Sequence, residues 1–152
     1  MFTLDQSVVI RAPIRDVYAI IADPRNEPKY LDAVKKLELL EGDGGPGSVF
    51  EETQLFLAGM EQKTTFTLHA WTPGAEVVMR SRTGPASFEI RWTVREVPGG
   101  TELRVKGDVQ PVWYLRWAQF VLAGQVNGTF AKSLGNLKRL VEEASGGSTT
   151  RT

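Results

Sequence analysis

A series of short glycine- and proline-rich breaks constrains the fold more than any other feature of the sequence. The breaks lie at 42–47, 59, 73–74, 84–85 and 98–100. The segments between them alternate apolar and polar side chains, as half-buried strands do. Turns this short join antiparallel strands, because parallel strands need a crossover of a dozen or more residues. The chain from residue 35 onward is therefore predicted to form six antiparallel strands.

A further strand and two short helices are predicted before this region. Residues 2–11 alternate apolar and polar side chains with the period of a strand. Pro13 suits the first position of a helix that runs to about residue 23, because its missing N–H would be unpaired there anyway. A second short helix is expected around residues 27–31.

The predicted sheet has one dry face that needs a cover. In the clearest strand the inward residues are Phe88, Ile90, Trp92 and Val94. The stretch from Trp113 to Glu143 contains no proline and is the one long element left to cover them. As a helix it would be about 45 Å long, enough to cross a domain of this size. The fold class predicted from these patterns is α+β.

The composition excludes several kinds of site. The chain has 152 residues, one His, no Cys, and 18 Lys and Arg against 18 Asp and Glu. Without Cys there is no thiolate ligand or cysteine nucleophile, and one His cannot supply two imidazoles. Zero net charge removes the attraction behind most nonspecific nucleic-acid binding, so no nucleic-acid partner is expected. Phosphate-loop, dinucleotide and nucleophile-elbow motifs are missing, and neither a cofactor nor a metal is predicted.

The length predicts a single domain over 1–143, followed by a disordered tail over 144–152 that is rich in Gly, Ser and Thr. No apolar stretch approaches the roughly 20 residues that a bilayer requires. Asp5 lies where a signal peptide would be apolar. We therefore expect a cytoplasmic protein without stable membrane insertion.

The predicted C-terminal helix contains glycines, which lower the stability of a helix. Its apolar stripe changes phase near Gly124, and each glycine inside a helix costs about 1 kcal/mol relative to alanine. In one interpretation Gly124 and Gly128 allow a bend or leave space above the sheet, and nearby polar residues then belong to a pocket. Those polar residues are Arg116, Gln119 and Asn127. In the other interpretation the glycines permit close helix–sheet packing and the polar side chains reach solvent.

The start of this helix, 112–123, is apolar almost all round, which is more than one buried stripe can use. A ligand, a second copy of the chain or a membrane surface would cover the excess. A pocket opening or a homodimer contact through Trp113–Phe120 is favoured, because the segment lacks the basic face of a membrane-binding helix.

The order of the elements carries a family resemblance. These elements are Ala12-Pro13, a helix with Val17-Tyr18, the Asp23-Pro24 stop, the six strands and a last helix ending in Leu137-Lys138-Arg139-Leu140-Val141-Glu142. Over residues 2–143 this order resembles the START-like, or SRPBCC, superfamily, and more narrowly its polyketide cyclase/dehydratase group. The resemblance implies a helix-grip fold, in which a seven-stranded curved antiparallel sheet surrounds the C-terminal helix and encloses a deep cavity for an apolar small molecule. Tyr30 stands where many relatives have Trp.

In the strand over residues 49–57, either the even-numbered or the odd-numbered side chains could face the interior. We predict that the even-numbered set faces inward, namely Phe50, Glu52, Gln54 and Phe56. A buried Glu52 would have a raised pKa and could serve as a proton donor or base, whereas an exposed Glu52 would do neither. His69 is out of phase with its apolar neighbours and is placed on the outer face. The predicted ligand-binding residues are Tyr30, Phe50, Glu52, Gln54, Phe66, Met79, Ser81, Phe88, Ile90, Trp92, Arg116, Gln119, Phe120 and Asn127.

Three functions remain open. The first is binding or carriage of a hydrophobic small molecule, such as a lipid, an isoprenoid or a polyketide-like ring. The second is an aromatase/cyclase-type polyketide cyclase or dehydratase, which needs a proton-transfer group inside the cavity. The candidates for that group are Glu52, Tyr18, Ser81 and Arg116. The third is an accessory protein that acts through a partner surface on the C-terminal helix; no catalytic residue is assigned.

Overall fold

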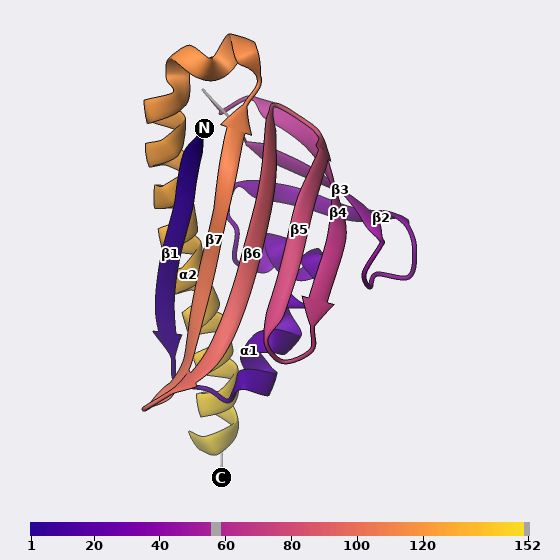
Figure 1. Ribbon diagram of the computed structural model, residues 1–152. Helices are drawn as coiled ribbons and strands as arrows, with labels where there is room; N and C mark the ends of the chain where they lie inside the picture. The colour runs from indigo at the N-terminus through magenta and orange to yellow at the C-terminus, as the bar shows by residue number, and fades with distance from the viewer. Residues whose placement is uncertain (56–58, 151–152) are drawn as a thin grey trace.

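The computed structural model describes residues 1–55 and 59–150, and the side chains of 1–55 and 59–144. Its strands form one antiparallel sheet in the order β1-β7-β6-β5-β4-β3-β2, with α2 along one face (Figure 1). In chain order the elements are β1 (Phe2–Ile10), α1 (Ile14–Ile21), η1 (Pro24–Lys29), β2 (Val34–Glu41), β3 (Val49–Leu55), β4 (Glu61–Thr72), β5 (Glu76–Thr83), β6 (Ala86–Val97), β7 (Gly100–Pro111), η3 (Trp113–Ala118) and α2 (Gln119–Thr150). The predicted α+β helix-grip architecture is confirmed, including two short helices between the first two strands.

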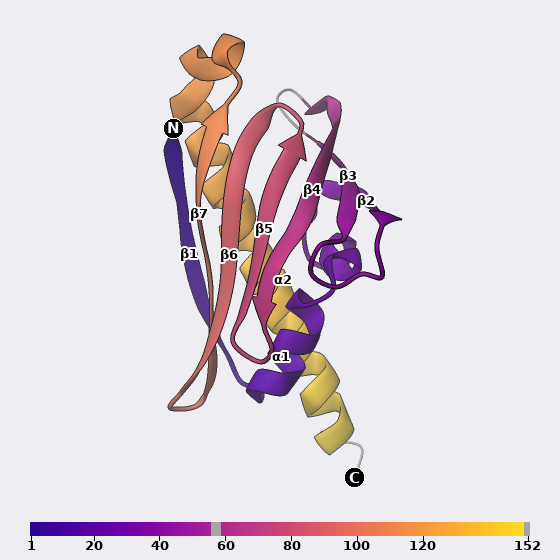
Figure 2. The same cartoon turned by 45° about the vertical axis from the view of Figure 1, so that its right-hand side comes forward.

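The first strand lies beside the last one. β1 pairs with β7 along its whole length, from Phe2 opposite Val109 to Ile10 opposite Thr101. α1 packs against β6 and β7, and η1 packs against β2 (Figure 2). The helices therefore all lie on the side of the sheet that the sequence predicted to be dry.

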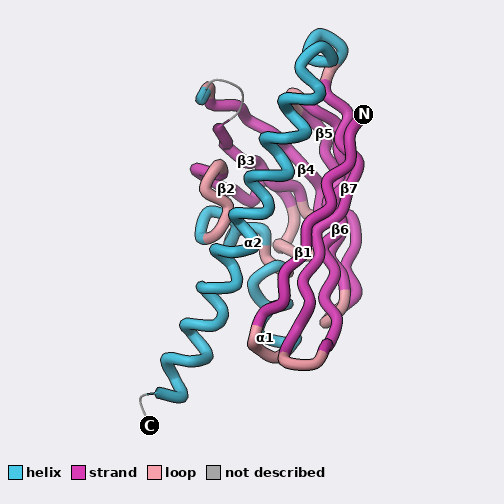
Figure 3. The backbone as a smooth tube through the Cα atoms, turned by 90° about the vertical axis from the view of Figure 1, so that its left-hand side faces the viewer, coloured by secondary structure: helices cyan, strands magenta, loops and turns pink. Residues whose placement is uncertain are grey.

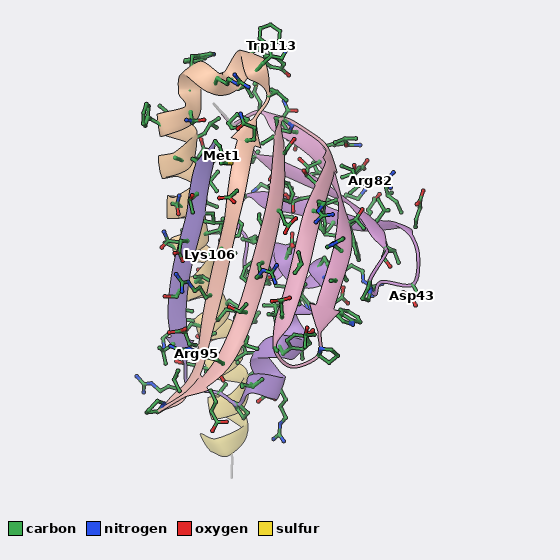
Figure 4. All side chains as sticks on the ribbon, viewed as in Figure 1. Met1, Asp43, Arg82, Arg95, Lys106 and Trp113 are labelled. Atoms are coloured by element: carbon green, nitrogen blue, oxygen red, sulfur yellow. The ribbon has the colours of Figure 1, made fainter. Side chains whose placement is uncertain are left out.

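The two faces of the central strands differ as their alternation predicts. Trp92, Leu103 and Val105 are buried between the sheet and the helices. The opposite face carries charged pairs across neighbouring strands, including Arg95 with Glu102 (Figure 4). Exposed pairs of this kind contribute little to stability, so the inner face supplies most of the packing energy.

The C-terminal half of α2 is packed more tightly against the core than its N-terminal half. Leu134, Leu137 and Val141, at the spacing of one helix face, are buried in the core. Val126 and Phe130 continue that face toward the N-terminal half but are only partly buried. The predicted stripe is confirmed, and its upper part is less tightly covered than its lower part.

Side chains of α2 attach it to the free edge of β1. Asn127 donates to the carbonyl of Thr3 at 3.1 Å and accepts from the backbone N–H of Asp5 at 3.3 Å. Lys138 donates to the carbonyl of Val9 at 2.8 Å. These odd-numbered strand residues point their backbone groups away from β7, so α2 satisfies an edge that would otherwise be unpaired (Figure 3).

The long helix differs from the expected one at both ends. Residues 113–118 form the 3₁₀ helix η3 and not part of an α-helix, because this segment buries only Ala118 and has no apolar stripe to dock. α2 continues to Thr150, past the expected end at residue 143. The predicted tail over 144–152 thus begins as helix; residues 151–152 lie outside the described residues, and the disorder of the tail stays a prediction.

The structure contradicts close packing as the reason for the helix glycines, and the polar residues of the other interpretation do not line the cavity, whereas a bend stays a prediction. α2 runs as a single helix through Gly124 and Gly128 (Figure 3). A Cβ atom added at either position would meet nothing within 4 Å, so close helix–sheet packing does not require glycine there. No helix in the described part of the chain is long and apolar enough to cross a membrane.

Candidate functional site

A cavity of about 140 Å³ lies between the inner face of the sheet and the N-terminal half of α2. Its wall is mostly apolar, with polar side chains from η1, β3, β4 and α2. The lining residues are Phe2, Glu27, Leu31, Ala33, Val34, Glu52, Gln54, Leu55, Thr64, Phe66, Met79, Pro85, Ala86, Phe88, Ile90, Trp92, Val109, Pro111, Leu122, Gln125, Val126, Thr129 and Phe130. Gln125 lines the cavity and is also exposed to solvent, so the cavity reaches the surface beside α2.

Glu27 is placed in the wall by the tight geometry of η1. Pro24 begins this helix, and the Asp23 carboxylate caps it by accepting from the N–H of Arg25 at 3.0 Å. The carbonyl of Glu27 accepts from the N–H groups of Tyr30 and Leu31, which ends the helix. The Glu27 side chain is then turned inward and is only 3% exposed.

Glu52 meets Glu27 from the neighbouring strand. In β3, Glu52 lies opposite Leu37 of β2 and Thr64 of β4, and alternation along β3 turns it toward the cavity. The two carboxyl groups are within hydrogen-bonding reach of each other. In the described part of the chain neither forms an ion pair with Lys or Arg.

Burial governs the protonation of this pair. Loss of solvation raises the pKa of Glu27 well above its ordinary value, and the neighbouring Glu52 raises it further. Loss of solvation also raises the pKa of Glu52, although the hydrogen bond from Glu27 opposes that rise. Two carboxyl groups so close in an apolar wall favour a state in which they share a proton. Because both pKa values are raised, the pair keeps a proton to a higher pH than exposed glutamates do.

A second polar contact lies beside the pair. The Gln54 amide donates to the Thr64 hydroxyl at 3.2 Å, and both residues line the cavity. The turn at Gly84 comes so close to Thr64 that a Cβ atom there would lie 2.7 Å from the hydroxyl oxygen. Gly84 has a φ of +134°, which side-chain-bearing residues rarely adopt, so glycine keeps this corner of the wall compact.

Aromatic rings form the inner end of the wall. The Trp92 ring meets Tyr30 edge to face with centroids 6.2 Å apart, and Phe130 of α2 at 5.9 Å. Trp92 is 1% exposed, and its indole N–H has no hydrogen-bond partner among the described residues. Burial raises the pKa of the Tyr30 hydroxyl well above its usual value, and the carboxylates of Glu27 and Glu52 add to the rise.

Part of the predicted ligand-binding set lies on the cavity wall. These residues are Glu52, Gln54, Phe66, Met79, Phe88, Ile90 and Trp92. The inward parity chosen for the strand is therefore correct at Glu52 and Gln54, whereas Phe56 lies outside the described residues. Their contact with a ligand stays a prediction.

Three predicted residues do not line the cavity: Tyr30 and Phe50 are buried in the core, and Ser81 is half-buried. Tyr30 packs on Trp92, and Phe50 stacks on Phe66 with ring centroids 5.5 Å apart. The Ser81 hydroxyl accepts a hydrogen bond from the backbone N–H of Phe88 at 2.8 Å, which links β5 to β6. The contact of these three residues with a ligand stays a prediction.

The predicted polar and aromatic residues at the start of the helix lie outside the cavity. Arg116 is exposed on η3, and Phe120 is 89% exposed. Gln119 accepts a hydrogen bond from the amino group of Met1. Asn127 serves the edge of β1, as described above. None of these four residues lines the cavity, because Arg116 and Phe120 are exposed and the two amides bind Met1 and the edge of β1; their contact with a ligand stays a prediction.

Among the candidates for proton transfer only Glu52 lines the cavity. The Tyr18 hydroxyl donates to the carbonyl of Glu76 at 3.1 Å, which keeps it in the packing between α1 and β5. His69 is exposed, as its parity predicted. No group of three or more His, Asp or Glu in the described residues is arranged to hold a metal ion.

Sequence reasoning missed Glu27 and the lining residues of α2. A signal for Glu27 was present, because residues 27, 30 and 31 share one side of the predicted short helix. Leu122, Val126 and Phe130 follow each other at four-residue spacing and all line the cavity. The burial of Glu27 itself depends on β3, which supplies its partner, and no local pattern contains that information.

Comparisons with known proteins agree with this architecture. The family model described as polyketide cyclase / dehydrase and lipid transport matches residues 1–142. Class-10 pathogenesis-related protein 1 of Medicago truncatula is 38% identical over 66 residues, which are 43% of this chain and 40% of that protein. The chain thus spans 40% of the length of the curated relatives that it matches.

Solved structures share the fold at low identity. An aromatase/cyclase from Streptomyces sp. R1128 has a TM-score of 0.79 at 17% identity, covering 93% of this chain and 94% of that one. A START superfamily protein from Mycobacterium smegmatis has a TM-score of 0.74 at 19% identity, covering 91% of this chain and 98% of that one. The match of the family model over almost the whole chain shows that this protein belongs to the polyketide cyclase / dehydrase and lipid transport family.

Proposed function

We propose that the protein binds a hydrophobic small molecule in the cavity between its sheet and α2. The observation that carries the proposal is the cavity itself, which is walled by aromatic and aliphatic side chains with polar groups gathered near Glu27 and Glu52. Such a division, with many apolar contacts and a few polar groups that set orientation, is typical of ligand pockets.

The volume limits what fits without rearrangement. An apolar cavity of about 150 Å³ holds a benzene ring, and this cavity measures about 140 Å³. One ring or a short chain therefore fits inside, and a longer lipid or polyketide would extend past Gln125 to the surface. The protein could carry such a ligand with only one end of it, such as a ring, enclosed in the cavity.

The second candidate is a cyclase or dehydratase, and the carboxyl pair is the observation that favours it. A carboxylate at Glu52 would remove a proton from the carbon next to a ketone. The acid proton held by Glu27 would pass to the ketone oxygen, which gives an enol. Loss of a neighbouring hydroxyl, together with one proton, would release water. This chemistry needs a paired acid and base within reach of the substrate, which the pair supplies.

The binding proposal is tested by filling the cavity from α2. Leu122→Trp places a larger side chain into the space, and we expect at least tenfold weaker binding of a one-ring hydrocarbon such as toluene. Val121→Trp is the matched control, because residue 121 is the neighbouring position on the same helix and is 64% exposed. Equal toluene affinity in both variants, with wild-type circular dichroism spectra, would overturn the proposal.

The enzymatic candidate has a separate test. Deuterium from solvent would enter cyclohexanone, a ketone with a single ring, at the carbon next to its carbonyl faster with wild-type protein than with Glu52→Gln, as followed by NMR. The control is Glu61→Gln, which changes an exposed glutamate in the strand next to β3. Exchange at the same rate with wild-type protein, Glu52→Gln and buffer would exclude catalysis of this step.

A further inference from the structure

Two buried polar atoms of residues that line the cavity have no hydrogen-bond partner among the described residues, and they differ in kind. One is Oε1 of Glu27, and the other is Nε1 of Trp92. They come from different elements, η1 and β6, and both side chains line the same cavity. Buried polar atoms are almost always hydrogen-bonded, so an unpartnered pair in one cavity indicates that the partner comes from outside the chain.

The chemistry of the two atoms restricts that partner. An indole nitrogen carries one N–H and can only donate. Oε1 of Glu27 accepts a hydrogen bond either as an oxygen of a carboxylate or as the carbonyl oxygen of a carboxylic acid. A partner that satisfies both atoms must therefore accept one hydrogen bond and donate another. A hydroxyl group does both, whereas an ether or a ketone only accepts and a hydrocarbon does neither.

We propose that Glu27 and Trp92 form a recognition site for the hydroxyl group of a ring-shaped ligand, such as a phenol or an enol. The Trp92 indole donates to the hydroxyl oxygen, the hydroxyl donates to Glu27, and Glu52 holds Glu27 in the required orientation. The apolar ring lies against Phe130 and the inner face of the sheet. This inference rests on the proposed function and names the class of ligand that the cavity selects.

An alternative explanation makes an opposite prediction. If the carboxyl pair only packs the protein, the cavity behaves as an apolar space, and toluene binds more tightly than phenol because the phenol hydroxyl loses its hydrogen bonds to water. If the pair recognises a hydroxyl, phenol binds more tightly than toluene, although the two molecules have nearly the same shape. The sign of the preference separates the two cases.

The experiment measures dissociation constants of phenol, anisole and toluene by ligand-observed NMR. For wild-type protein we expect phenol to bind about tenfold more tightly than toluene, with anisole between them, because two hydrogen bonds distinguish phenol and one distinguishes anisole. In Glu27→Met, which keeps the length of the side chain and removes both oxygens, we expect the preference to reverse in favour of toluene.

Two further variants separate hydrogen bonding from shape. Glu27→Gln keeps an acceptor at the position while its amide donates to Glu52, so the phenol preference should stay within about threefold of wild type. Met79→Leu changes an apolar part of the same wall and should alter phenol and toluene binding equally. Trp92→Phe should lower the affinity for anisole and phenol while toluene still binds.

The outcomes distinguish this inference from the proposal on which it rests. Toluene that binds wild-type protein more tightly than phenol, or a phenol preference that survives in Glu27→Met, would overturn the hydroxyl site and leave hydrophobic binding intact. If none of the three probes binds, ligand binding in the cavity is wrong as well, and the inference fails with it.

Discussion

At the scale of single residues, Glu27 is the costly feature of the molecule. A buried polar atom without a partner costs about 1–3 kcal/mol, and Oε1 of Glu27 is in that position among the described residues. Sites that bind ligands commonly retain such groups at the expense of stability. The carboxyl pair and the free indole N–H therefore identify the part of the wall where ligand recognition has the strongest physical support.

Replacement of Glu27 by an apolar residue of similar length should stabilise the unliganded protein. We expect Glu27→Met to raise the free energy of unfolding by about 1–3 kcal/mol at neutral pH, since it removes a desolvated carboxyl group. Urea denaturation measures the change. Glu96→Met, at an exposed position, is the control and should stay within about 0.5 kcal/mol of wild type. A loss of stability at position 27 would contradict this account.

The same residue should make stability fall as the pH rises. Because burial raises the pKa of Glu27, the folded protein keeps a proton that the unfolded chain releases. The stabilisation is complete below the ordinary glutamate pKa and is lost as the pH rises toward the folded pKa. Glu52 and Tyr30 face the group, and both have raised pKa values as well. Exposed carboxylates with lowered pKa, such as Asp5, act in the opposite direction only at more acidic pH.

This dependence is checked by urea unfolding of wild type and Glu27→Gln from about pH 5 to about pH 8. The wild-type protein should lose stability relative to the variant across that range. Parallel curves would mean that Glu27 ionises as an ordinary glutamate. Amide substitution at Glu38, whose pKa is lowered by Lys36, serves as a comparison with no expected loss over this range.

At the scale of elements, the sequence predicted what repeats regularly. The strands β6 and β7 and the stripe of α2 ending at Val141 follow simple periods, and the structure confirms them. The 3₁₀ helix at Trp113 has apolar residues on every side, so no periodicity distinguished it from an α-helix. Glu27 lies in the polar segment of η1, and its burial depends on β3. Contacts between distant segments, not local patterns, made the candidate site hard to predict.

Asn127 illustrates how a tertiary contact changes the role of a residue. The side chain bonds to backbone groups of Thr3 and Asp5 at the edge of β1. We expect Asn127→Ala to lower the free energy of unfolding by about 1–2 kcal/mol, and amide hydrogen exchange at Asp5 to accelerate. Gln125→Ala changes an exposed residue of the same helix at the mouth of the cavity, away from β1, and should change neither quantity. Unchanged exchange at Asp5 would show that the edge is held by other groups.

At the scale of the whole molecule, one end is packed and the other carries exposed aromatic rings. Trp117 and Phe120 are 81% and 89% exposed, and Trp113 projects from the same end (Figure 4). From residue 109 to residue 131 the only charged residue is Arg116. A contiguous apolar surface of this kind is unusual on a monomer, so the homodimer contact through Trp113–Phe120 stays a prediction.

Sedimentation velocity tests that contact. If two copies pair through this surface, the wild-type protein sediments as a dimer at micromolar concentration, and Trp117→Glu sediments as a monomer because it places a charge in the contact. Arg82→Glu changes an exposed residue of β5 and should leave the dimer intact. A wild-type protein that sediments as a monomer throughout would show that the surface does not pair two copies.

The attachment of α2 to β1 restricts the route by which a ligand could reach the cavity. Asn127 and Lys138 bind β1 at separated points along α2. The helix therefore cannot move away from the strand without breaking those hydrogen bonds. We therefore expect a ligand to enter and leave beside Gln125, where the cavity reaches the surface. Ligand exchange at that position would leave the contact between α2 and β1 intact.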